Sequence, residues 1–123
     1  MTSKVLSVVL LAAALVLASC DQSGPAGATS AAVSSAALVI DVREPSEFAA
    51  GHLSAAENIP VGQVEASVDA IAQKLGGDKT KPVVVYCHSG GRSARAKTVL
   101  EQAGFTNVTN AGGYEQLKGS IAR

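Results

Sequence analysis

The part of this sequence whose residue types and spacing could do chemistry is a cysteine followed by two glycines and an arginine. The segment reads Cys87-His88-Ser89-Gly90-Gly91-Arg92-Ser93 and comes directly after the apolar run Val83-Val84-Val85-Tyr86. Such a run is typical of a central parallel strand, which is buried on both faces. Ligands of open α/β sheets bind just beyond the carboxyl ends of the strands. Cys87 is therefore expected at a position suited to reaction.

Three features of this segment would stabilise a thiolate. Glycines allow consecutive backbone N–H groups to point inward as an anion-binding nest, and the helix expected after the loop adds the positive end of its dipole. Arg92 adds a full positive charge. We therefore predict that the pKa of the Cys87 thiol is lowered and that Cys87 is a nucleophile. The alternative is a small apolar residue that merely completes a buried strand.

The elements that would position this cysteine follow from short apolar runs alternating with helical patterns, which predict a parallel α/β sheet. Strands are expected over 38–41, 57–61, 83–87 and 107–109. Helices are expected over 45–50, over 61–75, after the cysteine loop up to residue 103, and over 114–117. The spacing of Arg43 and Glu47 predicts a structural ion pair across the start of the first of these helices.

The first twenty residues predict export. Lys4 precedes an uncharged apolar run from Val5 to Leu17, which has the form of a signal-peptide core and is shorter than the ~20 residues that a membrane-spanning helix needs. The segment Leu17-Ala18-Ser19-Cys20 resembles the bacterial lipobox, which implies a signal peptide over 1–19 and a lipid on Cys20. We expect the protein on the periplasmic side of a bacterial membrane, held there by this lipid alone. With an ordinary secretory signal it would be soluble in the periplasm or secreted.

The stretch 22–37 contains no charged residue and no apolar periodicity, which predicts a flexible linker. Residues 20–37 would then be the lipidated N-terminus and its tether, with a reach of ~20–24 Å. Residues 38–123 would form the only folded domain. Ten basic and ten acidic residues give a net charge of zero, and no block of like charge is present. Nucleic acid is therefore not an expected partner.

Several segments of the expected domain resemble the rhodanese family. The stretch Tyr86–Ala94 is similar to the family's active-site loop. Segments similar to its first and C-terminal signatures follow the family's order: Asp41-Val42-Arg43, Glu47-Phe48, Gly51-His52-Leu53, Ala56-Glu57-Asn58-Ile59-Pro60, Gly104-Phe105 and Asn110-Ala111-Gly112-Gly113-Tyr114. The resemblance implies a doubly wound α/β domain with a five-stranded, mostly parallel sheet flanked by helices.

The resemblance also implies a sulfurtransferase. Members of the family take a sulfane sulfur from a donor such as thiosulfate onto the cysteine and pass it to cyanide or to a thiol. Cys87 would be the catalytic nucleophile. The residues that bind the transferred sulfur would be His88, Ser89, Gly90, Gly91, Arg92 and Ser93. The reaction requires no metal and no cofactor, and we expect a monomer.

Two alternatives stay open at this point. The chain could be a persulfide carrier or binding module for a partner protein, which the sequence does not separate from an enzyme that consumes thiosulfate. Phosphatases and arsenate reductases of the same fold place five residues between cysteine and arginine, which makes a loop wide enough for a tetrahedral oxyanion. Here four residues, His88 to Gly91, separate Cys87 from Arg92, which favours sulfur transfer.

Overall fold

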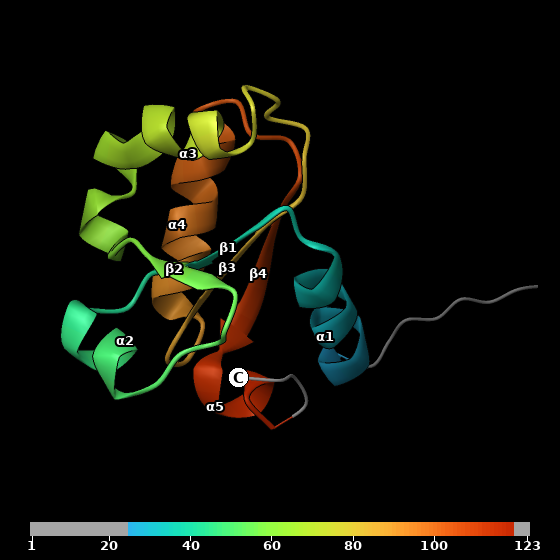
Figure 1. Ribbon diagram of the computed structural model, residues 1–123, viewed down its shortest axis with the longest axis vertical. Helices are drawn as coiled ribbons and strands as arrows, with labels where there is room; N and C mark the ends of the chain where they lie inside the picture. The colour runs from blue at the N-terminus through green and yellow to red at the C-terminus, as the bar shows by residue number, and fades with distance from the viewer. Residues whose placement is uncertain (1–24, 120–123) are drawn as a thin grey trace, which may run out of the picture.

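The computed structural model describes residues 25–119, which form a four-stranded parallel sheet with helices on both faces (Figure 1). The strands lie in the order β2-β1-β3-β4, and every neighbouring pair is parallel. Their bounds are Leu38–Asp41 (β1), Ala56–Asn58 (β2), Val83–Cys87 (β3) and Val108–Gly113 (β4). The predicted α/β class is confirmed, with four strands in the described residues where five were expected.

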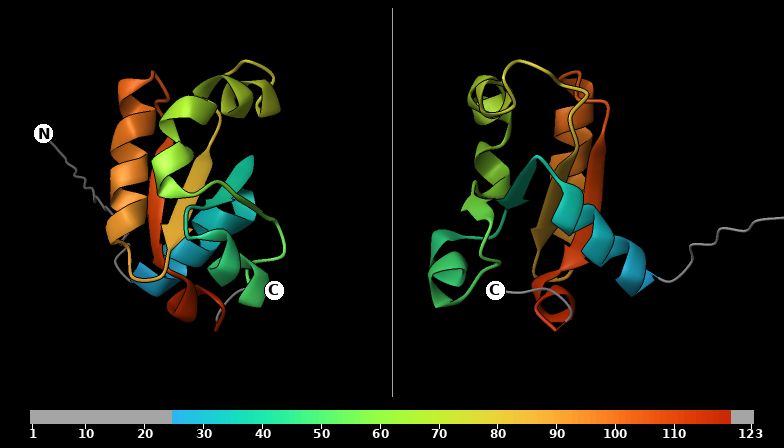
Figure 2. Two further views of the ribbon diagram at one scale, coloured as in Figure 1. Left: turned by 90° about the vertical axis from the view of Figure 1, so that its left-hand side faces the viewer. Right: turned by 45° about the vertical axis from the view of Figure 1, so that its right-hand side comes forward.

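Five α-helices connect or flank these strands. Their bounds are Pro25–Ser35 (α1), Pro45–Ala50 (α2), Val68–Lys74 (α3), Gly91–Gln102 (α4) and Tyr114–Leu117 (α5). Figure 2 shows α3 and α4 on one face of the sheet, with α1 on the opposite face. Among residues 25–119, no helix has both the length and the apolar character needed to cross a bilayer.

The strands alternate their side chains between two cores, as the pleat requires. On the α3 and α4 face, Ile40, Val85 and Cys87 pack with Ile71 and Leu100. On the α1 face, the strand residues Val39, Val84 and Tyr86 pack with Val33, Tyr114 and Leu117. Cys87 therefore belongs to the face that α4 covers.

Two expected elements have different bounds in the structure. The second strand ends at Asn58 instead of residue 61, although Ile59 still donates its N–H to the carbonyl of Asp41 at 3.0 Å. Pro60 interrupts the ladder because it has no N–H to donate. The helix expected over 61–75 is divided into two 3₁₀ turns, Val61–Gln63 and Glu65–Ser67, followed by α3.

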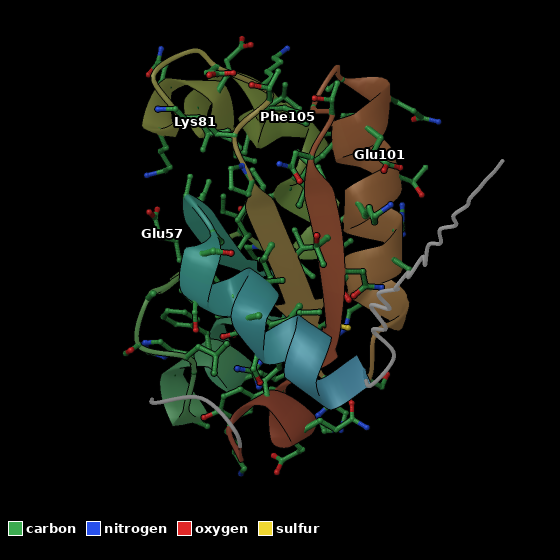
Figure 3. All side chains as sticks on the ribbon, turned by 90° about the vertical axis from the view of Figure 1, so that its right-hand side faces the viewer. Glu57, Lys81, Glu101 and Phe105 are labelled. Carbon is green, nitrogen blue, oxygen red and sulfur yellow. The ribbon has the colours of Figure 1, made fainter. Side chains whose placement is uncertain are left out.

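The flexible linker expected over 22–37 is wrong for residues 25–35, which form α1. This helix lies across the face of the sheet in Figure 3. Val33 is only 7% exposed and packs with Ala32 and Ala36 in the core on the α1 face of the sheet. The folded part therefore begins before residue 38. The proposed signal peptide over 1–19 and Cys20 lie outside the described residues.

Candidate active site

Cys87 is the last residue of β3 and has no exposed surface. The β-branched run of Val83 to Val85 makes this strand the centre of the sheet, between β1 and β4. The pairing of β3 with β4 shifts register between Val85 and Cys87, and the shift places Cys87 opposite Gly113. The end of β3 is thus held against the end of β4.

The loop after Cys87 turns back over its sulfur and leads into α4. Gly90 has a φ of 106°, in the left-handed region, and is the N-cap of the helix. Glycine adopts this conformation without strain. The turn directs the Gly90 N–H to the Cys87 Sγ at 2.9 Å. Of the glycine pair from which a nest is predicted, Gly90 thus directs its N–H to the sulfur.

Gly113 supports the loop from below, a role that the sequence did not reveal. A Cβ at this position would overlap the carbonyl oxygen of His88 and lie 3.5 Å from the Cα of Ser89. Only the absence of a side chain allows β4 to approach the loop so closely. The contact with Gly113 at the end of β4 therefore fixes the position of His88 and Ser89 relative to the sheet.

Ser93 places a buried hydroxyl beside the sulfur. It lies in the first turn of α4 and has no exposed surface. Its Oγ is 3.4 Å from the Cys87 Sγ, 3.1 Å from the Gly90 carbonyl oxygen and 2.6 Å from the Asn110 Oδ1. Ser93 is among the site residues that the sequence predicts, whereas Asn110 belongs only to the segment that resembles the family's C-terminal signature.

The net effect of these surroundings is a lowered pKa for the Cys87 thiol. Burial is the largest single influence and by itself raises the pKa, because it disfavours the charged thiolate. Hydrogen bonds from the Ser93 side chain and from the backbone of Ser93, Gly90 and Ser89 outweigh burial. The prediction of a lowered pKa agrees with the structure, and its cause is mainly the donors of the loop.

Arg92 is held by Glu47 of α2. Its Nη1 lies 2.8 Å from Oε1 and its Nη2 lies 3.1 Å from Oε2, which makes a bidentate pair. The hydrogen bond from Arg92 is the main cause that lowers the pKa of Glu47 to about 2. Arg92 thus closes the loop against α2, and the charge of Cys87 is only a minor influence on its guanidinium.

The ion pair predicted between Arg43 and Glu47 is wrong. Arg43 instead binds the buried carboxylate of Asp41, with Nη2 2.7 Å from Oδ2, and the same nitrogen donates to the Gly51 carbonyl at 2.7 Å. Its guanidinium also lies 4.5 Å from the ring centre of Tyr114. The buried Asp41–Arg43 pair therefore fixes the chain after β1 to the end of α2, and Glu47 is left free to bind Arg92.

The six predicted binding residues do not all face the sulfur. Ser89, Gly90 and Ser93 are the residues whose hydrogen-bond donors face the sulfur. The side chains of His88 and Ser89 are exposed on the outer surface of the loop. Gly91 begins α4 and is exposed, and the Arg92 side chain is directed to Glu47. Among residues 25–119, no three His, Cys, Asp or Glu side chains gather as metal ligands would.

The match to the Rhodanese-like domain family covers residues 26–120, and the chain belongs to this family. The matched range begins in α1, in agreement with the packing of this helix. The thiosulfate sulfurtransferase PspE of Escherichia coli is 37% identical over 78 residues, which are 63% of this chain and 71% of that protein. The uncharacterized protein YqhL of Bacillus subtilis is 40% identical over 86 residues, and the match spans 64% of its length.

Solved structures show the same fold. A structure described as a rhodanese with anions from E. coli is 37% identical, with a TM-score of 0.60, and the match covers 68% of this chain and 92% of that one. The human single-domain sulfurtransferase TSTD1 is 28% identical, with a TM-score of 0.63, over 80% of this chain and 94% of that one.

Proposed function

We propose that this protein is a sulfurtransferase that carries a sulfane sulfur on Cys87. The observation that carries the proposal is a thiol at the end of the central strand, with the Gly90 N–H at 2.9 Å and the Ser93 hydroxyl at 3.4 Å. These donors favour the thiolate, which is the nucleophilic form. Relatives named as thiosulfate sulfurtransferases support thiosulfate as a donor.

The reaction has two steps. The Cys87 thiolate attacks the outer sulfur of thiosulfate, a bond forms between the two sulfurs, and the S–S bond of thiosulfate breaks. Sulfite leaves with the electron pair of that bond, and the enzyme holds a persulfide anion. Cyanide or a thiolate then attacks the outer sulfur, and Cys87 leaves again as a thiolate. Cyanide gives thiocyanate, whereas a thiolate takes the sulfur as its own persulfide.

The loop residues have separate roles in these steps. The N–H groups of Ser89 and Gly90 stabilise the charge on sulfur, as preorganised donors do in other group transfers. Cys87 has no exposed surface, so access of the donor to its Sγ requires the site to open. A loop of four residues between Cys87 and Arg92 is the feature that distinguishes this proposal from phosphatase or arsenate reductase chemistry.

Intact mass spectrometry tests the proposal. Thiosulfate should add one sulfur atom to a Cys20→Ser variant, in which Cys87 is the only thiol, and cyanide should remove that atom as thiocyanate. The matched control is a Cys20→Ser, Cys87→Ser variant, which should fold normally and do neither. If the Cys87 protein gained no sulfur from any donor, the proposal would be wrong. Transfer only to a partner protein, without turnover on cyanide, would identify a persulfide carrier.

A further inference from the structure

The Ser93 hydroxyl has one proton and three neighbouring acceptors. The Cys87 sulfur is 3.4 Å from its oxygen, the Gly90 carbonyl is 3.1 Å away, and the Asn110 Oδ1 is 2.6 Å away. A hydroxyl donates one hydrogen bond at a time. The three acceptors therefore compete for the proton, and the shortest of the three contacts is the one with Asn110.

The orientation of the Asn110 amide is fixed by two backbone groups. Its Oδ1 accepts the Gly112 N–H at 2.9 Å, and its Nδ2 donates to the Gly90 carbonyl at 3.2 Å. Turning the amide over would lose both hydrogen bonds. The oxygen of Asn110 therefore faces the Ser93 oxygen, and two oxygens at 2.6 Å need a proton between them.

The direction of that proton decides what the sulfur receives. While Ser93 donates to Asn110, it presents only a lone pair to Cys87, which suits a neutral S–H group. A thiolate gains the Ser93 hydrogen bond only when the hydroxyl turns away from Asn110 and from the Gly90 carbonyl. Thus Asn110 favours the uncharged state of the sulfur, and Ser93 favours the thiolate when it is free to turn.

We propose that Asn110 is a positioning residue that tunes the ionisation of Cys87 by competing with the sulfur for the Ser93 proton. The same competition should respond to formation of the persulfide. Once Cys87 carries an outer sulfur, the negative charge moves to that atom, and the Ser93 hydroxyl donates to Asn110 again. This second statement rests on the proposed sulfur transfer, whereas the first concerns the thiol alone.

Other groups around the sulfur do not provide this competition. Arg92 is the charged side chain of the first turn of α4, and its guanidinium is paired with Glu47 of α2. The side chain of His88 is exposed on the loop. The described part of β4 contains no charged residue.

Two substitutions should have opposite effects. Ser93→Ala removes the donor and should raise the thiol pKa, whereas Asn110→Ala removes the competing acceptor and should lower it. A change of about one unit corresponds to a roughly tenfold change in the thiolate fraction below the pKa. The measurement is the ultraviolet absorbance of the thiolate against pH in a Cys20→Ser background, which does not depend on access to the buried sulfur.

A double-mutant cycle separates competition from loop support. If Asn110 acts through Ser93, the Asn110→Ala shift should disappear in a Ser93→Ala background. The control is Thr109→Ala, on the same strand and paired with Val84 of the opposite face. If Asn110→Ala does not fold, Asn110→Leu fills a similar volume without an acceptor and carries the same expectation.

A raised pKa in the Asn110 variant, or a shift that persists without the Ser93 hydroxyl, would show that Asn110 only supports the loop and would overturn the proposal. These titrations need no sulfur donor. They can therefore fail while the mass test of sulfur transfer succeeds, or succeed while that test fails.

Discussion

At the scale of single residues, the charge on Cys87 depends on uncharged donors more than on the arginine beside it. The hydrogen bonds that lower its pKa come from Ser93, Gly90 and Ser89, and the guanidinium of Arg92 is already paired with a carboxylate. A dianionic donor such as thiosulfate would therefore meet an ion pair at this side of the loop, whereas the sequence analysis considered only the positive charge of Arg92.

The Glu47–Arg92 pair leads to a kinetic prediction. Glu47→Gln leaves the Arg92 cation uncompensated, so we expect thiosulfate to bind several-fold more tightly, with a lower KM. Arg92→Ala removes the cation and should raise the KM, by roughly ten- to hundredfold for a charged contact of ~1.5–3 kcal/mol. Steady-state kinetics with thiosulfate and cyanide measures both. Equal losses in the two variants would show that the pair acts only as a brace for the loop.

Glu47 also contributes to the dependence of stability on pH. Its folded pKa of about 2 lies below the ordinary value of 4.5, so the native state binds this proton more weakly than the unfolded state does. The stabilisation is complete above the unfolded pKa and is lost as the pH falls towards 2. Between pH 6 and pH 3, the Tm of Glu47→Gln should therefore fall less than that of the wild type. Thermal scans at the two pH values, with Glu65→Gln as an exposed control, measure the difference.

Gly113 offers a test of how finely the loop must be placed. A methyl group at this position overlaps the His88 carbonyl, so Gly113→Ala should displace the loop and reduce the rate of sulfur transfer on the order of 10–100-fold, as small misplacements do in other sites. Gly62→Ala is the matched control, because a Cβ at Gly62 meets nothing within 4 Å. A Gly113→Ala variant with wild-type kinetics would show that the loop tolerates the displacement.

At the scale of elements, the sequence predicted those whose apolar pattern is strong. The β-branched run of β3 and the apolar stripe of α4 agree with the structure, and Cys87 follows from them directly. The Arg92–Glu47 contact joins residues 45 positions apart. Local spacing favoured Arg43 as the partner of Glu47 instead. Asn110 was missed for a related reason, since its role appears only when β4 lies beside the start of α4.

The helix α1 was missed because its sequence has no apolar stripe to reveal a buried face. Alanine favours helix, but alanine and serine over this stretch look equally like a linker. The buried face of α1 depends on one valine: Val33 is 7% exposed and packs in the core on the α1 face of the sheet. Ala32 of α1 and Ala36, just after the helix, also pack against this core.

Removal of α1 should destabilise the fold. A chain that starts at residue 38 lacks Val33 and with it part of the core on this face of the sheet, so its Tm should be lower than that of a chain starting at residue 21. Val33→Ala should cost about 1–2.5 kcal/mol, from two lost methyl groups and the cavity they leave. Ser34→Ala on the exposed side of α1 is the control and should be nearly neutral. Equal Tm values for the two chain lengths would mean that α1 does not support the sheet.

At the scale of the whole molecule, the topology gathers the site from distant parts of the chain. The ends of β1, β3 and β4 bring Asp41, Cys87 and Gly113 to one edge of the sheet, as parallel strands require. The same arrangement places α1, the first described element, on the opposite face from α4. The first element that the structure describes is therefore a helix already packed on the domain.

This packing changes what a lipid on Cys20 would do. Only residues 21–24 separate Cys20 from the start of α1, and the five steps from Cys20 to Pro25 span at most ~18 Å. We therefore propose an anchor that keeps the domain close to the membrane surface, in place of the longer tether expected from the sequence. Fractionation of bacterial cells should find the wild type with membranes and Cys20→Ser in the soluble periplasmic fraction. If both proteins were equally soluble, Cys20 would carry no lipid, and the segment before it would be an ordinary export signal.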